Sequence, residues 1–388
     1  MKQIPYGHQD ISEADISAVN DVLHSDWLTQ GPLVDKFEEA VANYCNAKYA
    51  VSVCNATAAL HLACLALDIK KGDYVWTSPN TFLASANCAL YCGASIDFVD
   101  IDPKTYNLSI ESLTHKLEIA AKNNKLPKLI LPVHFAGQSC DMRAIRSLAD
   151  KYKFYVVEDA SHAIGGKYYD HNIGDCAYSD MAVFSFHPVK IITTGEGGMI
   201  MTNKKELCEK LKLLRSHGMT RNPETMVSES HGTWYYQQIA LGYNYRLTDL
   251  QCALGLSQLS RIDEFVDRRH ELVKRYNQAL KDLPVILPFQ EKYNYSAFHL
   301  YVIQLKLDQI KKTRGQVFDE LRAAGIGVAV HYIPVHLQPH YRQFGFKEGD
   351  YPEAEKYYDG VITLPLYFGL SESEQDFVIT SARRLYVR

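Results

Sequence analysis

The chain has 388 residues, which is too long for one ordinary hydrophobic core and indicates a large domain together with a smaller one. Its 41 basic and 45 acidic side chains give a formal charge of -4 without a long basic run, so neither nucleic acid nor an anionic membrane is expected as the main partner. The first residues lack an apolar stretch of signal-peptide length, and no apolar run reaches the roughly 20 residues of a membrane span, so we expect a cytoplasmic protein.

Nine cysteines are scattered along the chain without a C-x-x-C pair. An odd number of thiols cannot all pair within one chain, so we expect a reducing compartment and unpaired, buried thiols. Cys88 and Cys92 are four residues apart, the spacing of one helix face, but no histidine lies near them in the sequence. We interpret them as packing residues, and no metal site is expected.

Two helices are expected at the start of the chain. Apolar residues recur at helical spacing from Ile11 to His24, where Ser12 and Asp15 can form the helix start. A loop containing Gly31-Pro32 follows, and a second helix is expected from Val34 to Tyr44.

From residue 50 onward, short apolar runs alternate with helical patterns. Strands are expected at Ala50–Val53, Tyr74–Thr77, Ser95–Val99, Lys128–Val133, Phe154–Val157 and Met181–Phe186, and helices at Ala56–Leu67, Thr81–Tyr91, Ser109–Asn123 and Asp141–Tyr152. This alternation predicts an α/β fold with a largely parallel sheet covered by helices on both faces. In such sheets the ligand binds outside the carboxyl ends of the strands.

The residues just beyond three strand ends are candidates for such a site. Ala56 and Thr57 open a helix whose free amides form an anion site, although a simple capped helix start is the alternative. Phe82 places an aromatic ring at the mouth of the site, and Asp159 and His162 place a carboxylate and an imidazole there.

A fourth strand end carries Lys190, in the stretch F-S-F-H-P-V-K-I-I-T-T-G-E-G-G. Pro188 ends regular pairing after the strand, and Gly195, Gly197 and Gly198 predict a turn in which the backbone comes close to a ligand. Desolvation at the edge of a buried sheet lowers the pKa of a lysine and supplies the neutral amine that forms Schiff bases with carbonyls. An unremarkable surface lysine is the alternative.

Together, these four strand ends match the requirements of pyridoxal phosphate (PLP). The cofactor needs helix amides and hydroxyls for its phosphate, a lysine for its aldehyde, a carboxylate for its pyridine nitrogen and a flat ring for stacking.

Six motifs in the right order resemble those of the DegT/StrS family of sugar aminotransferases, which are PLP enzymes of the aspartate aminotransferase fold (fold type I). They are Trp27-Leu28-Thr29-Gln30-Gly31-Pro32, Asn55-Ala56-Thr57-Ala58-Ala59-Leu60, Glu158-Asp159-Ala160, Ser185-Phe186-His187-Pro188-Val189-Lys190, Gly195-Glu196-Gly197-Gly198 and Gly242-Tyr243-Asn244-Tyr245-Arg246-Leu247-Thr248-Asp249. The resemblance covers nearly the whole chain, and six ordered motifs are far more specific than any one of them.

The resemblance implies roles for individual residues. Lys190 carries the Schiff base and Asp159 keeps the pyridine nitrogen protonated, so these two are the expected catalytic residues. Contacts with PLP are implied for Ala56, Thr57, Phe82, Asp159, His162, Ser185, Lys190 and Asn244. Asn244 is expected to reach the phosphate from the partner subunit, which implies a homodimer with shared sites.

The resemblance also implies the reaction and its substrates. L-Glutamate is the expected amino donor, and a UDP-linked keto sugar is the expected acceptor, with another nucleotide-linked sugar and amination at C3 or C4 left as alternatives. Substrate contacts are expected from Tyr6, Thr29, His187, Arg246, His331 and Tyr332. A pyridoxamine-dependent sugar dehydratase would carry His in place of Lys190, and a PLP-binding regulator without turnover is the rival from another class.

The last third predicts a small α+β domain. Helices are expected at Leu250–Gln258, Arg261–Leu280 and Arg314–Ala324, and strands at Phe298–Leu305 and Val328–His331. We therefore expect residues 1–249 to hold the N-terminal segment and the cofactor domain, and residues 250–388 the linking helices and the small domain. His331, His336 and His340 are interpreted as packing or substrate residues, because Pro334 and Pro339 prevent the helix that would align them on a metal.

Overall fold

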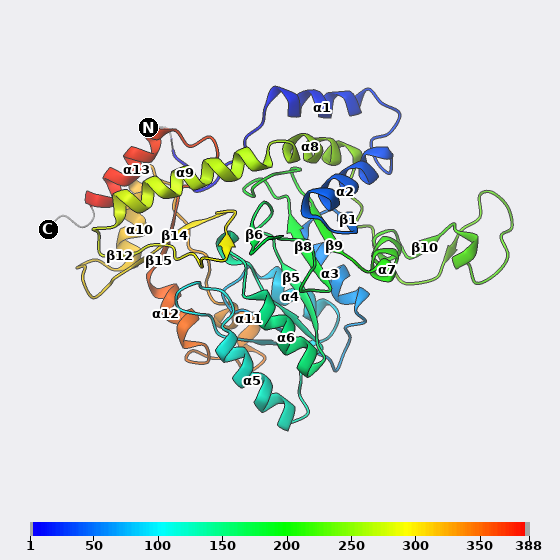
Figure 1. Cartoon of the computed structure of the whole chain (residues 1–388), viewed down its shortest axis with the longest axis horizontal. Helices are drawn as coiled ribbons and strands as arrows, with labels where there is room; N and C mark the ends of the chain where they lie inside the picture. The colour runs from blue at the N-terminus through cyan, green and yellow to red at the C-terminus, as the bar shows by residue number, and fades with distance from the viewer. Residues whose placement is uncertain (1–2, 385–388) are drawn as a thin grey trace.

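A seven-stranded sheet lies at the centre of the computed structural model, which describes residues 3–384 (Figure 1). In spatial order its strands are β1 (Tyr49–Val53), β9 (Gly198–Thr202), β8 (Met181–Ser185), β5 (Tyr155–Asp159), β4 (Leu129–Leu131), β2 (Tyr74–Thr77) and β3 (Ser95–Phe98). The strands from β8 to β3 are parallel, whereas β9 is antiparallel to both β8 and β1. The predicted α/β fold with a mostly parallel sheet is confirmed, and the carboxyl ends of β1, β2, β5 and β8 lie at one edge.

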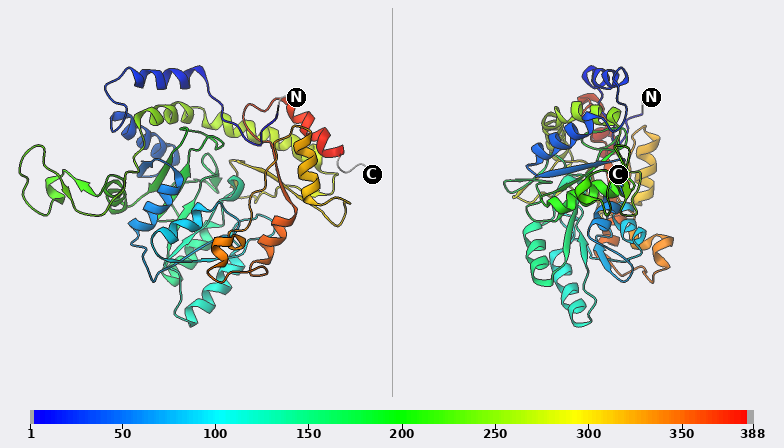
Figure 2. Two further views of the ribbon diagram at one scale, coloured as in Figure 1. Left: turned by 180° about the vertical axis from the view of Figure 1, so that it is seen from behind. Right: turned by 90° about the vertical axis from the view of Figure 1, so that its right-hand side faces the viewer.

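Helices cover both faces of this sheet, as the two views in Figure 2 show. One face packs against α3 (Ala56–Ala66), α4 (Ala84–Tyr91) and α7 (Lys205–Arg215). The other face packs against α2 (Pro32–Cys45), α5 (Ile110–Lys122), α6 (Met142–Tyr152) and α8 (Asp249–Leu259). Along β8, Val183 faces the first layer and Ala182 and Phe184 face the second, because successive side chains of a strand point to opposite faces.

The N-terminal helix α1 (Glu13–Leu23) begins where the sequence predicts. Ser12 caps it, and the Ser12 and Asp15 side chains each bond the other residue's backbone amide in a capping box. The helix lies against α8, on the outside of the cofactor-domain layers (Figure 1).

The long helix α9 (Ile262–Leu280) leads into a second, smaller unit with its own antiparallel sheet. Its strands are β12 (Val285–Ile286), β14 (Tyr301–Leu305) and β15 (Val361–Leu364), and its helices are α10 (Arg314–Ala323), α11 (Pro339–Arg342), α12 (Pro352–Gly360) and α13 (Glu372–Arg384). A third small sheet joins β6 (Lys167–Tyr168), β7 (His171–Asn172) and β13 (Asn294–Tyr295).

The structure differs from one strand prediction and from the end of one predicted turn. Val328–His331 is not a strand: it forms a single bridge, from Ala329 to Thr363, and β15 supplies the strand that pairs with β14. The expected glycine turn ends at Gly198, which is already the first residue of β9. Strand β9 was not predicted, because its apolar run follows directly on the glycines.

The first residues of the described chain pack against the small unit. Ile4 donates to the Gly325 carbonyl (2.9 Å) and accepts from the Gly327 amide (2.6 Å). The N-terminal segment was expected to belong with the cofactor domain, yet these contacts join it to the small unit. The division into residues 1–249 and 250–388 stays a prediction, and its ends, residues 1–2 and 385–388, lie outside the described chain. Among residues 3–384, none of the helices has both the length and the apolar character needed to cross a bilayer.

A hairpin arm projects from the body of the molecule between α7 and α8 (Figure 1). It carries β10 (Met219–Thr220) and β11 (Gln237–Gln238), and we call residues 219–241 the arm. Three of its large apolar side chains are strongly exposed to solvent: Val227 is 86% exposed, Trp234 72% and Leu241 78%. Exposed apolar groups gathered on one projecting segment are typical of a contact with another protein surface.

Candidate active site

Lys190 lies in a turn just beyond the end of β8, as predicted. The turn is closed by a hydrogen bond from the Lys190 amide to the His187 carbonyl (2.9 Å). Burial lowers the pKa of Lys190 to about 8, and the Asp159 carboxylate opposes that effect in part. A substantial fraction of this amine is therefore neutral near physiological pH, which is the state that attacks a carbonyl.

Asp159 is the last residue of β5 and is almost fully buried. Its Oδ2 accepts a 2.5 Å hydrogen bond from the Ser85 hydroxyl, and its Oδ1 accepts a 3.1 Å bond from the Ser161 amide. Ser85 belongs to the first turn of α4, and no sequence pattern connects that turn with β5. These bonds fix the orientation of the carboxylate.

The start of α3 lies beside the end of β8. Gly198 of β9 pairs with Val53 on one side and Ser185 on the other, which brings Ser185 close to the helix that begins at Ala56. A side chain at position 198 would come within 2.7 Å of the Asn55 carbonyl carbon and 2.8 Å of the Ala56 nitrogen. Glycine is thus required here for close packing.

Asn55 caps this helix, because its Oδ1 accepts from the Ala58 amide (2.8 Å). The amides of Ala56 and Thr57, at the first two helical positions, have no acceptor within the helix and carry the positive end of its dipole. The capped start and the anion site are therefore compatible.

Three buried histidines, His162, His299 and His331, lie near enough to Lys190 to be affected by its charge. Burial is the main cause that lowers the pKa of each, and the charge of Lys190 adds to it; the pKa of His331 falls to about 3. All three are consequently neutral near physiological pH. His299 was not predicted: its ring lies 4.4 Å from that of His162, and its Nδ1 has no hydrogen-bond partner among residues 3–384.

Tyr332 links the small unit to this cluster. Its hydroxyl lies 3.2 Å from His162 Nε2, and its amide donates to Asn80 Oδ1 (3.3 Å). Burial raises the pKa of Tyr332, so the phenol stays protonated. The Phe82 ring is 6.4 Å from that of Tyr332 and 58% exposed, which leaves one aromatic face open beside the buried polar groups.

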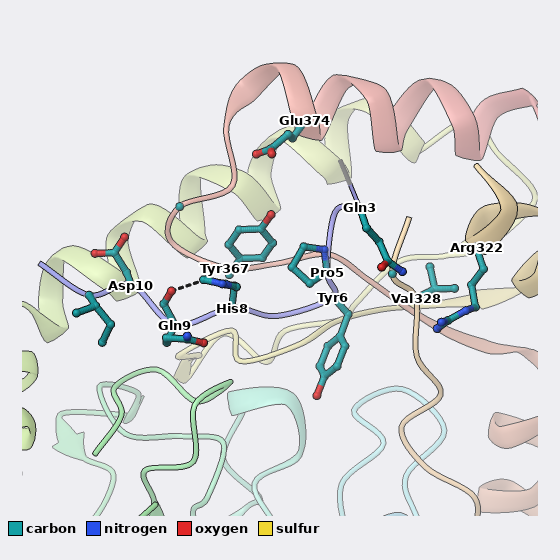
Figure 3. Close-up of a pocket in the computed structure, with 13 residues that line it drawn as sticks. Gln3, Pro5, Tyr6, His8, Gln9, Asp10, Arg322, Val328, Tyr367 and Glu374 are labelled. Carbon is teal, nitrogen blue, oxygen red and sulfur yellow. Dashed lines mark hydrogen bonds between the residues drawn. The ribbon is translucent and has the colours of Figure 1, made fainter. Parts of the chain in front are cut away.

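Tyr6 joins the same region from the N-terminal segment, with its ring 5.4 Å from that of His331. In Figure 3 the Tyr6 side chain lies on the opposite side of that segment from Tyr367 and Glu374. The cavity drawn there, of about 800 Å³, includes Tyr6 but neither Lys190 nor Asp159 in its wall. This cavity is therefore separate from the lysine and the carboxylate.

Four predicted residues, Thr29, His187, Asn244 and Arg246, make no side-chain hydrogen bond to Lys190 or Asp159 in the described chain, although the His187 carbonyl accepts from the Lys190 amide. Thr29 forms a bridge with Thr248, and Asn244 forms one with Ser216 and has an exposed side chain. His187 is also exposed, and no side-chain hydrogen bond links it or Arg246 to Lys190 or Asp159 in the described chain. Their roles at the site stay predictions.

The three histidines considered as metal ligands have separate surroundings. His331 Nδ1 lies 2.8 Å from Thr363 Oγ1, His336 Nε2 lies 2.8 Å from Glu355 Oε1, and the His340 ring packs edge-on against Phe344.

The sequence match over residues 9–383 is to the DegT/DnrJ/EryC1/StrS aminotransferase family. The chain belongs to this family. Its relatives include the spore coat polysaccharide biosynthesis protein SpsC of Bacillus subtilis, 42% identical over 98% of this chain and 96% of SpsC. The UDP-4-amino-4,6-dideoxy-N-acetyl-beta-L-altrosamine transaminase of Campylobacter jejuni is 38% identical over 97% of this chain and 95% of that protein. GDP-perosamine synthase of Caulobacter vibrioides is 38% identical over 95% of this chain and 94% of that protein.

Solved structures of the family superpose on the whole chain. PseC of Helicobacter pylori, an aminotransferase involved in the biosynthesis of pseudoaminic acid, has a TM-score of 0.91 at 30% identity and covers 99% of both chains. Spr1654 from Streptococcus pneumoniae in its PLP-form has a TM-score of 0.88 at 29% identity, covering 99% of this chain and 100% of that one, and a PMP-form is also known. This member of the DegT family is thus a PLP-dependent nucleotide-sugar aminotransferase.

The residues of the site fit the cofactor of the family on chemical grounds. A partly neutral lysine amine, a buried carboxylate with fixed orientation and a helix start with two free amides lie at neighbouring strand ends. Each corresponds to one reactive or charged part of PLP: the aldehyde, the pyridinium nitrogen and the phosphate.

Proposed function

We propose that this enzyme transfers the amino group of L-glutamate to C4 of a UDP-linked 4-keto-6-deoxy sugar. The acceptor we favour is UDP-2-acetamido-2,6-dideoxy-L-arabino-hex-4-ulose, on the pathway to pseudaminic acid. The proximity of Lys190 to Asp159 carries the aminotransferase chemistry. The choice of sugar is supported by the Campylobacter jejuni and Helicobacter pylori relatives, both connected by name with this chemistry.

Lys190 and Asp159 are the proposed catalytic residues. The neutral amine of Lys190 would bond the aldehyde of PLP, and Asp159 would keep the pyridine nitrogen protonated. When bound, PLP supplies an electron sink for the bonds at the amino-bearing carbon. The Lys190 amine, once released, would remove and return the proton at that carbon as general base and acid.

Six further residues of this chain are proposed to hold the cofactor. The Ala56 and Thr57 amides and the Ser185 hydroxyl would bind the phosphate, Phe82 would stack on the ring, and His162 would lie near the ring hydroxyl. His162 is itself held by the Tyr332 hydroxyl (3.2 Å), which would keep the imidazole in place during turnover. Asn244 completes the set from the partner subunit.

The substrate side of the site is proposed to include Tyr6, His331 and Tyr332, which lie together in one chain. Thr29, His187 and Arg246 are proposed to join them when the sugar nucleotide or the partner subunit is present. The neutral histidines would let this region bind sugar hydroxyls without adding positive charge near Lys190.

The active assembly is proposed to be a homodimer with shared sites. Asn244 is exposed and makes no side-chain hydrogen bond to Lys190 in the described chain, and the neighbouring arm presents Val227, Trp234 and Leu241 to solvent. Mixing inactive Lys190→Ala and Asn244→Ala dimers tests this, because subunit exchange creates heterodimers with one intact site. We expect activity to return after exchange, and its failure to return despite proven exchange would mean that Asn244 serves its own subunit's site.

A panel of keto sugars tests the substrate. UDP-, dTDP- and GDP-linked 4-keto and 3-keto sugars are offered with L-glutamate, and the amine product is analysed by NMR while 2-oxoglutarate is quantified. We expect the highest kcat/KM with the UDP-linked 4-keto-6-deoxy N-acetyl sugar. A clear preference for another nucleotide or for C3 amination would favour a different nucleotide-sugar aminotransferase, and binding without 2-oxoglutarate would favour a regulator.

The role of Lys190 is tested separately from the sugar. Lys190→Ala is expected to abolish turnover and the absorbance band of the lysine-bound cofactor, and Lys190→Arg, which keeps the charge, is expected to do the same. Transamination by either variant at the parent rate would refute the assignment.

A further inference from the structure

Two tyrosines flank Asn244, the residue that we propose reaches the cofactor of the partner subunit. The segment is held in extended form: the Tyr243 amide donates to the Leu214 carbonyl (2.7 Å), and Asn244 forms an antiparallel bridge with Ser216. The rings of Tyr243 and Tyr245 stack at 5.0 Å, with 19° between their planes. Both rings therefore lie on one side of the segment, and the exposed Asn244 side chain lies on the other.

His61 of helix α3 contacts both of these tyrosines. The centroid of its ring lies 4.9 Å from that of Tyr243 and 6.1 Å from that of Tyr245, and its Nδ1 is 3.3 Å from the Tyr245 hydroxyl oxygen. His61 is buried, and on α4 the Tyr91 ring packs edge-on against it at 5.5 Å. One buried ring thus fixes the side chains on both sides of Asn244.

We propose that His61 is a positioning residue for the cofactor site of the partner subunit, because it holds the tyrosine pair that presents Asn244. This inference rests on the proposed role of Asn244 in the shared site. The ligand is the phosphate of PLP, to which the side-chain amide of Asn244 would donate. That amide makes no hydrogen bond to other residues among 3–384, so the backbone of the segment and its two flanking rings set its direction.

The sequence gives no local signal of this support, because His61 and Tyr245 lie 184 positions apart. The alternative is that His61 serves the cofactor site of its own subunit. Tyr245 also provides that connection: its carbonyl accepts from the Cys54 amide (2.8 Å), two residues before the helix start that we assign to the phosphate. A substitution at His61 can thus reach two cofactor sites, and measurements on defined heterodimers separate them.

Heterodimers with one working cofactor site show which site His61 serves. One subunit keeps Lys190, the other carries Lys190→Ala, and two different affinity tags isolate the mixed dimer. His61→Leu is placed either in the Lys190→Ala subunit, which would supply Asn244 to the working site, or in the subunit that keeps Lys190. The affinity for PLP is measured from the absorbance band of the lysine-bound cofactor, which only the working site forms.

We expect His61→Leu in the Lys190→Ala subunit to weaken the binding of PLP at the working site about fivefold, as expected for the loss of one or two weak contacts behind a binding residue. The same substitution in the subunit that keeps Lys190 should leave that affinity within about twofold of the reference heterodimer. No loss in either arrangement, an equal loss in both, or a larger loss in the second would overturn the proposal.

Tyr91→Leu is the matched control for His61→Leu. It removes a ring that packs against His61 but does not flank Asn244, and Tyr91 is 54% exposed. We expect PLP binding to stay unchanged in both arrangements. A loss equal to that of His61→Leu would mean that general packing around α3 and α4 causes the effect, which would also overturn the proposal.

Tyr245→Phe is a second variant, which removes only a hydroxyl and therefore keeps the ring stack. It loses the contact with His61 Nδ1. In the Lys190→Ala subunit we expect it to weaken PLP binding about threefold, because one neutral hydrogen bond is lost. Tyr91→Phe, which removes a hydroxyl from the other side of His61, should have no effect. Equal effects of these two variants would contradict the role assigned to His61.

Asn244→Ala in the same two arrangements distinguishes a failure of this inference from a failure of the shared site. It is expected to weaken PLP binding only from the Lys190→Ala subunit. If Asn244→Ala acts in this way and His61→Leu does not, the site is shared but His61 is not a positioning residue for it. If Asn244→Ala has no effect from that subunit, the shared site itself is refuted, and the inference with it.

Discussion

The Ser85 hydroxyl donates a 2.5 Å hydrogen bond to Asp159 Oδ2 and thereby ties the first turn of α4 to the end of β5. Ser85 Oγ is also 2.7 Å from Thr81 Oγ1, so the hydroxyl is held on two sides. The carboxylate that we propose faces the pyridine nitrogen gains its orientation from this contact. Ser85 is in our interpretation a positioning residue that acts through Asp159.

Replacing Ser85 by Ala is expected to lower kcat/KM about tenfold and to weaken the retention of PLP. A hydrogen bond to a charged group contributes about 1.5–3 kcal/mol, and only part of that affects the reaction, because Asp159 keeps the bond from the Ser161 amide. Steady-state kinetics and dialysis against cofactor-free buffer measure the two effects.

Ser179 offers a matched control for Ser85. Its hydroxyl donates an equally short 2.5 Å bond to Glu158, the residue before Asp159 on β5. The other carboxylate oxygen of Glu158 bonds the buried His134. Ser179→Ala is expected to lower the free energy of unfolding and to leave kcat/KM unchanged. Equal kinetic losses in the two variants would mean that Ser85 acts only through stability.

Gly198→Ala is expected to weaken the cofactor site by moving the start of α3. The added methyl group would come within 2.8 Å of the Ala56 nitrogen, so either β9 or the helix start must shift. Such overpacking costs roughly 1–3 kcal/mol, and here it falls on an amide that we assign to the phosphate. The affinity of the apoenzyme for PLP, measured by titration of absorbance, should fall at least severalfold.

Gly195 separates this steric effect from backbone strain. It has φ of +79°, and a methyl group added there would meet no atom within 4 Å, so Gly195→Ala strains the turn without pressing on α3. We expect that variant to lose stability while it keeps most of its affinity for PLP. If Gly195→Ala loses PLP as severely as Gly198→Ala, the close packing at Gly198 is not the reason.

Local sequence signals predicted the framework of this site. The capping box of Ser12 and Asp15, the strand of which Ser185 is the last residue and the helix starting at Ala56 all depend on neighbours in sequence, and the structure has each of them. The position of Lys190 after β8 and of Asp159 at the end of β5 follows from strand order in a parallel sheet.

The features that escaped prediction depend on contacts between distant segments. Ser85 meets Asp159 across 74 positions, and His299 meets His162 through the packing of the small unit, so no local pattern identifies either. Val328–His331 has the composition of a strand, yet β15 takes the adjacent place beside β14. Propensity alone could not decide between these two segments.

Tyr332→Phe is expected to lower kcat/KM about fivefold. The hydroxyl that lies 3.2 Å from His162 Nε2 is lost, and a neutral hydrogen bond in a buried site contributes about 1 kcal/mol. Tyr276→Phe is the control, because that buried phenol donates to the Pro365 carbonyl in the small unit (3.0 Å). Both variants should lose similar stability in urea, and a kinetic loss shared by both would argue against a role for Tyr332 in placing His162.

Lys190→Met should stabilise the cofactor-free protein at neutral pH, and this advantage should shrink as the pH rises. The pKa of Lys190 is about 8 in the folded chain, against an ordinary 10.5. Below pH 8 the Lys190 amine carries its proton in both the folded and the unfolded chain, so the full cost of burying its charge is present. Between pH 8 and 10.5 the unfolded chain binds more protons, so wild-type stability rises with pH relative to the variant.

The pH-dependent part of the difference amounts to about 3 kcal/mol at most, because one pKa unit corresponds to about 1.4 kcal/mol. Urea unfolding of the wild type and of Lys190→Met at about pH 7 and about pH 10 measures it. One protein concentration is used throughout, because association in the proposed homodimer would contribute to stability. Groups other than Lys190 titrate in both proteins and cancel in the comparison. A stability difference that is the same at both pH values would show that Lys190 is not desolvated in the folded state. The supply of neutral amine at this strand end would then need another explanation.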